Sequence, residues 1–138
     1  RPIYLVDVRE ETNPIVVGTF PFPTNMADIC KRPGADTHNL APNFGTPTSR
    51  YLENTVIASN TKFGLRIYHL QDQRVPFPKV APPLIEEVGY FIPPPAAKNN
   101  GAVDINYSIV DENGVIYVLD GKRGGLYILK YTGEVPLN

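Results

Sequence analysis

The chain has 138 residues, the length of one ordinary domain, with 42% hydrophobic residues and a formal net charge of −1. This balanced charge, without a long basic run, excludes the electrostatic footprint of nucleic-acid binding, so no nucleic-acid partner is expected. No apolar run approaches the ~18 residues of a membrane span, so no span is predicted, and the single cysteine, Cys30, excludes an intrachain disulfide.

Short runs rich in β-branched and aromatic residues predict strands along the whole chain and no helix. In chain order they are Ile3–Val8, Ile15–Phe20, Asp36–Leu40, Thr55–Ala58, Leu65–Leu70, Glu87–Ile92, Val103–Val110, Val115–Leu119 and Leu126–Tyr131. Several are apolar at consecutive positions, which is typical of strands covered on both faces by neighbouring sheets. An Asn-Gly pair, Asn113-Gly114, predicts a tight hairpin between two of them. The fold class is therefore all-β.

One segment of the sequence occurs twice. TVIASNTKFGL (Thr55–Leu65) matches IYVLDGKRGGL (Ile116–Leu126), which follows 61 residues later without a gap, and IYLVDV (Ile3–Val8) matches Leu65–Leu70. Repeats longer than about 50 residues that consist only of strands are typical of β-propeller blades, each a four-stranded antiparallel sheet. Because one blade cannot bury both of its faces, we expect the chain to be part of a closed structure. Its predicted strands amount to a partial ring of about two and a half blades.

The predicted strand order divides the chain into three parts. Residues 1–23 supply the third and fourth strands of a partial blade, residues 24–95 form a complete blade, and residues 96–138 form a final blade without its fourth strand. Such incomplete blades predict that further blades, from the same precursor or from other chains, cover the exposed edges. The chain starts at Arg1 rather than Met, so we expect a processed or fragmentary chain.

The complete blade has a long loop, Gln71–Pro83, between its third and fourth strands. Four prolines make this loop stiff. It is either an insertion tolerated at the rim of the blade or a docking surface for a protein partner.

Four stretches of the chain resemble a known family. They are RPGADTHNL (Arg32–Leu40), FGLRIYHL (Phe63–Leu70), EEVGYFIPPP (Glu86–Pro95) and DENGVIYVLDGKRGGLYILKYTG (Asp111–Gly133). Together they are similar to the LVIVD-repeat proteins, whose blades carry a Gly-Leu-aliphatic-Ile-Asp strand, a Pro-rich turn and a Val-Gly strand. The resemblance implies a β-propeller, usually of about seven blades, in an exported protein of the periplasm or the extracellular space.

His38 is the residue best suited to chemistry. It is expected at the start of an innermost strand, which lines the central channel of a propeller, and imidazole is both a transition-metal ligand and an acid–base group. Asp36, two residues earlier, would share its face and orient the ring or join it at a metal. The alternative is a structural histidine that hydrogen-bonds between blades. Other metal ligands would come from blades outside this chain.

The predicted loops bring further charged residues to the mouth of the channel. Lys62 and Arg123 align with each other in the tips between second and third strands, and these tips share one face of a propeller with the links that precede His38 and Asp104. A basic rim of this kind would attract an anionic ligand. The alternative is a solvated loop edge.

Three functions remain open. The first is a non-enzymatic exported binding or interaction module, because stacked blades form a rigid platform whose loops are free to vary. The second follows from a distant similarity to the selenium-binding proteins, which include metal-dependent methanethiol oxidases, and it implies an enzyme with His38 and a transition metal in the channel. The third is a structural component of a larger assembly, indicated by the incomplete blades.

Overall fold

The computed structural model describes residues 2–22, 36–41, 50–71, 83–94, 103–122 and 124–137. These residues form nine strands, namely β1 (Tyr4–Asp7), β2 (Ile15–Thr19), β3 (Thr37–Leu40), β4 (Thr55–Asn60), β5 (Gly64–Gln71), β6 (Leu84–Phe91), β7 (Ile105–Val110), β8 (Val115–Asp120) and β9 (Gly125–Lys130). They form no helix, so none of the described segments could cross a membrane as a long apolar helix. The all-β prediction is confirmed.

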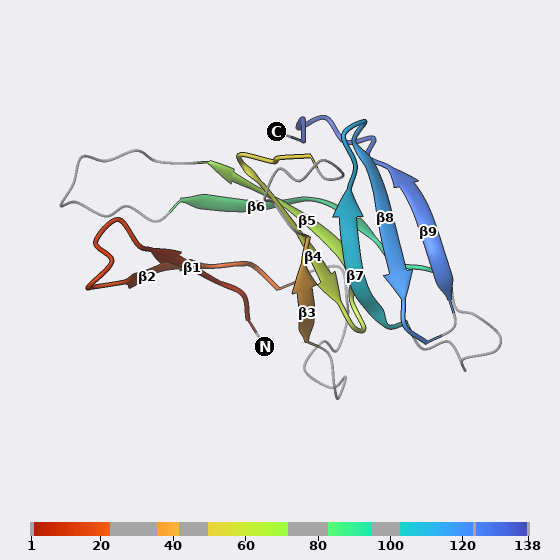
Figure 1. Ribbon diagram of the computed structural model, residues 1–138, viewed down its shortest axis with the longest axis horizontal. Coiled ribbons are helices and arrows are strands. Elements are labelled where there is room, and N and C mark those ends of the chain that lie inside the picture. Colours follow the sequence, from red (N-terminus) through yellow and green to blue (C-terminus); the bar gives the residue numbers. More distant parts are fainter. Residues whose placement is uncertain are drawn as a thin grey trace.

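The strands form three antiparallel sheets, each built from consecutive strands (Figure 1). They are sheet 1 (β1 and β2), sheet 2 (β3, β4, β5 and β6) and sheet 3 (β7, β8 and β9). Strand β6 begins earlier than predicted, because its first residues Leu84 and Ile85 pair with Gln71 and Leu70 and so extend the hairpin beyond the two glutamates. The three sheets do not close into a ring within the described residues.

Glycines with positive φ angles lie at three of the tight turns between strands. Gly64 and Gly125 begin β5 and β9 with φ angles of 74° and 86°, in the left-handed region that side chains disfavour. In the predicted Asn-Gly turn, Gly114 has φ 78° and donates its N–H to the carbonyl oxygen of Asp111 over 3.0 Å. The hairpin prediction at this position is therefore confirmed.

Corresponding hairpins of sheets 2 and 3 pair in the same register. In sheet 2, Thr55 lies opposite His69, and in sheet 3, Val115 lies opposite Lys130. The spacing is therefore 60 residues before the turn and 61 after it, since the turn has three residues in sheet 2 and four in sheet 3. The ungapped match with an offset of 61 residues was therefore wrong by one residue for the strand before the turn and correct for the strand after it.

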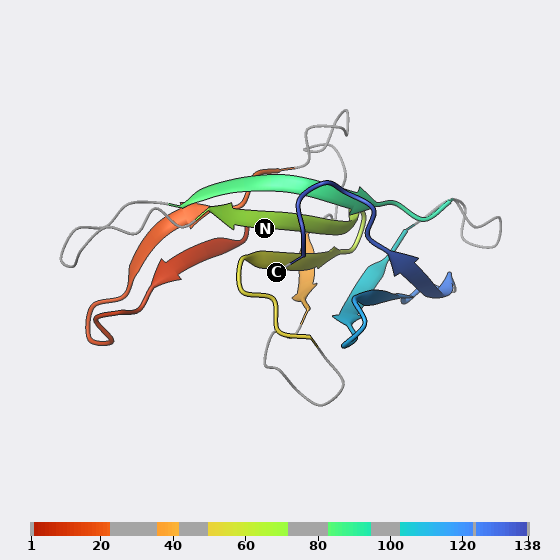
Figure 2. The ribbon, with the colours of Figure 1, turned by 90° about the horizontal axis from the view of Figure 1, so that it is seen from above.

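Sheet 2 lies between the other two sheets, as the chain-order colours show (Figures 1 and 2). Because side chains alternate along β4 and β5, neighbouring residues face different sheets. Ile57 and Ile67 belong to a buried cluster shared with sheet 3, whereas Ala58 and Tyr68 pack with Phe20, which follows β2. The two buried serines Ser59 and Ser108 also join sheets 2 and 3, with 2.9 Å between their Oγ atoms. The prediction that strands are covered on both faces is confirmed for β4 and β5.

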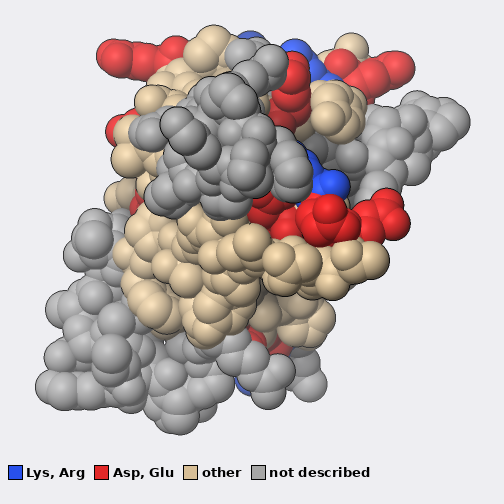
Figure 3. Space-filling view, turned by 90° about the vertical axis from the view of Figure 1, so that its left-hand side faces the viewer, with Lys and Arg blue, Asp and Glu red and all other residues tan. Residues whose placement is uncertain are grey.

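The outer faces of sheets 1 and 3 are apolar and exposed. Ile67 in β5 is 4% exposed, but its counterpart Ile128 in β9 is 65% exposed. On the opposite side, Tyr68 is 3% exposed, but its counterpart Val6 in β1 is 42% exposed. Seen from the sheet 1 end, a continuous uncharged area adjoins groups of both charges (Figure 3). Positions that belong to the core in sheet 2 are therefore surface in the two outermost sheets.

Candidate functional site at the β3–β7 edge

The first strands of sheets 2 and 3 lie side by side and form the β3–β7 edge (Figure 1). Each is the end strand of its sheet and pairs on one side only among the described residues. Each ladder also has a one-residue shift in register, which leaves His38 in β3 and Asn106 in β7 without a cross-strand partner. A shift of this kind bends the strand and redirects a side chain.

His38 and Asn106 therefore occupy equivalent positions, and they contact each other. The Nδ1 atom of His38 lies 3.0 Å from the carbonyl oxygen of Asn106. Because a carbonyl oxygen only accepts, Nδ1 is the donor, and Nε2 of the exposed ring carries the lone pair when the imidazole is neutral. This is the bond between sheets that the structural interpretation of His38 predicted.

Asn106 links His38 to Asp104. In the amide orientation that satisfies its partners, the Nδ2 atom of Asn106 donates to the carbonyl oxygen of Asp104 over 2.7 Å and to its Oδ1 atom over 3.1 Å. The N–H of Gly121 donates to the same carbonyl oxygen over 2.8 Å. A Cβ atom at Gly121 would overlap the Asn106 amide, so the glycine makes room for this arrangement.

Asp36 belongs to a different hydrogen-bond group. Its N–H donates to Thr61 Oγ1 over 3.2 Å, and its carbonyl oxygen accepts from the N–H of Thr61 over 3.0 Å. These bonds tie Asp36 to the β4–β5 turn that carries Lys62. The expected shared face of Asp36 and His38 assumed a regular alternation, and the shift in register at His38 interrupts that alternation.

The structure thus connects His38 with Asp104 through Asn106, and Asp36 with the Lys62 turn through Thr61. Neither Asn106 nor Thr61 was predicted as a site residue. Alignment of the first strands through their pairing partners, rather than through the repeated segment, would have matched Asn106 to His38. Arg123 and Cys30 lie outside the described residues, as do residues 72–82 of the long loop, so the basic rim and the docking loop stay predictions.

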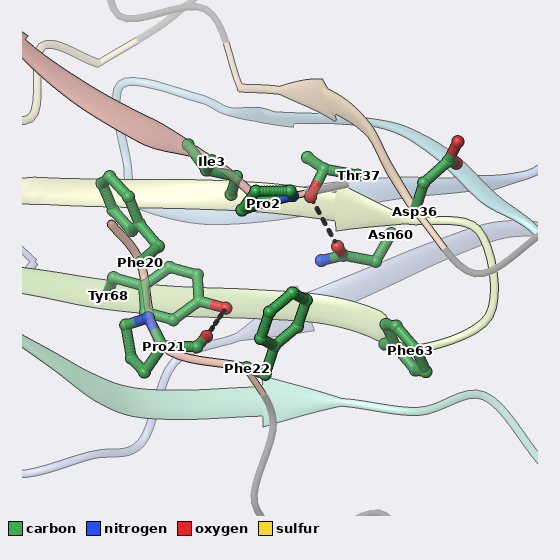
Figure 4. A pocket seen from close by; sticks show the side chains of 10 residues that line it. All are labelled: Pro2, Ile3, Phe20, Pro21, Phe22, Asp36, Thr37, Asn60, Phe63 and Tyr68. Atoms are coloured by element: carbon green, nitrogen blue, oxygen red, sulfur yellow. Dashed lines mark hydrogen bonds between the residues drawn. The ribbon is translucent and has the colours of Figure 1, made fainter. Parts of the chain in front are cut away.

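A small cavity between sheets 1 and 2 borders this region (Figure 4). Its volume is about 20 Å³, which is room for one water molecule. Thr37 donates to Asn60 over 3.0 Å, and the Tyr68 hydroxyl donates to the carbonyl oxygen of Pro21 over 3.3 Å. The Asp36 carboxylate points away from the other lining side chains. The cavity is therefore part of the packing interface between sheets 1 and 2 and is too small for an organic ligand.

A buried arginine forms an ion pair between β5 and β6. The Arg66 side chain is fully buried, and its Nη1 atom lies 3.1 Å from Oε1 of Glu87. Its Nε atom donates to the carbonyl oxygen of Phe63 over 2.9 Å, and the guanidinium lies 5.0 Å from the centre of the Tyr90 ring. Glu87 and Tyr68 lie opposite each other, and burial, with a smaller contribution from the Glu87 charge, raises the pKa of Tyr68 to about 12.

This raised pKa predicts a loss of stability at high pH. Because folding favours the neutral phenol, the contribution of Tyr68 to stability is complete below its usual pKa of about 10 and is lost as the pH rises through about 12. We expect the free energy of unfolding, measured in urea, to fall between these pH values. Tyr68→Phe should flatten that fall, whereas Tyr107→Phe, at a position 39% exposed, should leave it unchanged. An equal slope in all three proteins would contradict the assignment.

The described residues do not by themselves complete a metal centre. Within the described ranges, no group of three or more His, Cys, Asp or Glu side chains converges. His38 offers Nε2, but the carboxylate expected beside it, that of Asp36, belongs to the Thr61 group. A metal at His38 would therefore need its other ligands from blades outside this chain, so the metal site stays a prediction.

Comparisons with known proteins give no match to a family model, to a curated protein or to a solved structure.

Proposed function

We propose that this chain is part of an exported LVIVD-type β-propeller that acts as a binding or interaction module in the periplasm or outside the cell. Residues 1–23, 24–95 and 96–138 belong to three successive blades, and further blades complete the ring. The β3–β7 edge faces the channel, where His38, Asp104 and the Lys62 turn present polar groups to a ligand.

One observation carries this proposal: equivalent strand positions are buried in sheet 2 and exposed in sheets 1 and 3. Ile67 and Tyr68 each have a neighbouring sheet to cover them, whereas their counterparts Ile128 and Val6 do not among the described residues. Large apolar patches on a protein surface usually mark a contact with another protein surface. Matching registers in sheets 2 and 3 support the view that the missing neighbours are sheets of the same kind.

The association state of the chain tests the proposal. We expect native mass spectrometry at micromolar concentration to show assemblies larger than one chain, because association would bury the exposed apolar side chains on the outer faces of sheets 1 and 3. Val6→Lys on sheet 1 and Leu119→Lys on sheet 3 should each reduce assembly while the circular dichroism of the sheets is kept, since these side chains are 42% and 46% exposed. Ile67→Lys, at a position 4% exposed, is the matched control that should unfold the chain instead. A stable, soluble monomer of the unmodified chain would overturn the proposal.

A further inference from the structure

The outer edge of β9 is an open pairing site. β9 pairs only with β8 among the described residues, whereas its counterpart β5 pairs with both β4 and β6. In an antiparallel ladder every second residue directs its N–H and C=O groups toward the neighbouring strand on a given side. The outer edge of β9 therefore presents backbone donors and acceptors that an extended segment can pair with.

A groove lies beside this edge, between sheet 3 and sheet 2. Its volume is about 370 Å³, and β5 and β6 line one wall while β8, β9 and the residues after β9 line the other. Val88, Phe91 and Leu129 line the groove and also pack on the buried cluster between the two sheets. A segment in this groove would therefore continue an interface that already exists.

Gly125 leaves space for a strand at this position. Gly64 and Gly125 begin β5 and β9 with similar positive φ angles. A Cβ atom at Gly64 would overlap the carbonyl oxygen of Phe91 in the adjoining strand β6, whereas no atom of the described residues would lie within 4 Å of a Cβ atom at Gly125. The φ angle of Gly125 already favours glycine at this position, and the absence of a side chain also leaves room for a strand beside β9 that corresponds to β6.

We propose that the groove between β6 and β9 binds an extended strand with the pattern acidic–x–Val–Gly, which pairs with the outer edge of β9. This proposal rests on the proposed function and specifies the partner of sheet 3. The β1–β2 and β5–β6 hairpins share the Val-Gly part of this pattern. Gly18 lies opposite Leu5 and Gly89 lies opposite Ile67, and in each hairpin the register shifts by one residue at the valine before the glycine. The counterpart of Ile67 in β9 is Ile128, so the strand places its glycine opposite Ile128.

Charge complementarity with Lys130 defines where the acidic residue of the bound strand should lie. Lys130 lines the groove at the end of β9 and is exposed. Its counterpart in β5 is His69, which lies opposite Glu86, three residues before Gly89. An acidic side chain three residues before the glycine of the bound strand would therefore lie opposite Lys130, where opposite charges on neighbouring strands attract.

The probe for this site is a synthetic peptide with the sequence LIEEVGYF, that of β6. We expect the peptide to slow hydrogen exchange of Gly125–Lys130 in the full chain at least tenfold at saturation, with no effect on Tyr4–Asp7. Two control peptides each replace one glutamate with lysine. LIEKVGYF changes the second glutamate and keeps the acidic–x–Val–Gly pattern. LIKEVGYF changes the first glutamate, which is expected opposite Lys130, and it should bind several-fold more weakly. Lys130→Glu should exchange the preference, so that it favours LIKEVGYF.

Gly125→Ala gives the sharpest variant, because the added methyl group contacts none of the described residues in the free chain but would overlap a backbone carbonyl of a bound strand. We expect Gly125→Ala to keep the circular dichroism of the native sheets and to lose the protection of β9. Equal binding of all peptides, or protection that survives Gly125→Ala, would overturn the inference. If the peptide protects β9 but the chain stays monomeric, the proposed function is contradicted and this inference is not. If the chain forms assemblies but the peptide does not protect the β9 amides, this inference is contradicted and the proposed function is not.

Discussion

Gly64→Ala is expected to lower the free energy of unfolding by about 3–5 kcal/mol, a range reached only by changes with a clear steric or burial cause. The φ angle of 74° alone costs an alanine about 1–2 kcal/mol. The added Cβ atom would also overlap the carbonyl oxygen of Phe91 and lie 3.1 Å from the Cα atom of Ile92. These are backbone atoms, so relief requires β6 to move away from β5.

The matched control is Gly125→Ala at the same place in β9. Its φ angle of 86° carries the same conformational cost, but no atom in the described part of the chain lies within 4 Å of the added atom. We therefore expect a loss of only about 1–2 kcal/mol for this variant. Urea unfolding of both proteins measures the difference. Equal losses would show that the contact with β6 does not contribute.

Removal of the Glu87 carboxylate is the second large effect. We expect Glu87→Ala to cost about 3 kcal/mol, because Arg66 is buried in full and would keep its charge without this partner. The Glu87 side chain is 21% exposed, which places the expected loss at the lower end of the range for buried pairs. Glu86→Ala, on the exposed neighbour, should change stability by less than about 0.5 kcal/mol.

A double-mutant cycle separates the ion pair from packing. Arg66→Met keeps most of the side-chain volume and removes the buried charge, so Glu87→Ala should cost much less in that background. Urea unfolding of the four proteins gives the coupling free energy. If Glu87→Ala costs the same with and without Arg66, the two charges do not stabilise each other.

The strands and their order in the sheets could be predicted because their signals are local. β-branched runs mark the strands, and Gly64, Gly114 and Gly125 mark the turns between them. The extra turn residue in sheet 3 could not be read from the repeat, because a gapped and an ungapped match differ by only one residue there.

The candidate site was less predictable, because its geometry depends on pairing between strands that are distant in the sequence. The shift at His38 is defined by β4, and the hydrogen bond of His38 goes to Asn106, 68 residues away. The burial of Arg66 was not anticipated either, since it depends on sheet 1 covering β5 and on Glu87 in the next strand. A charged residue in a strand otherwise indicates an exposed position.

The assembly of each sheet from consecutive strands has a consequence for folding kinetics. Hairpins such as β4–β5, with a three-residue turn, lose little chain entropy on closure, so their formation is fast and does not depend on distant parts of the chain. The β4–β5 hairpin is also the most deeply buried, and it is therefore expected to nucleate the structure. Among the described sheets, sheets 1 and 3 would then join after sheet 2 and open before it, which gives a gradient of local opening from sheet 2 outward.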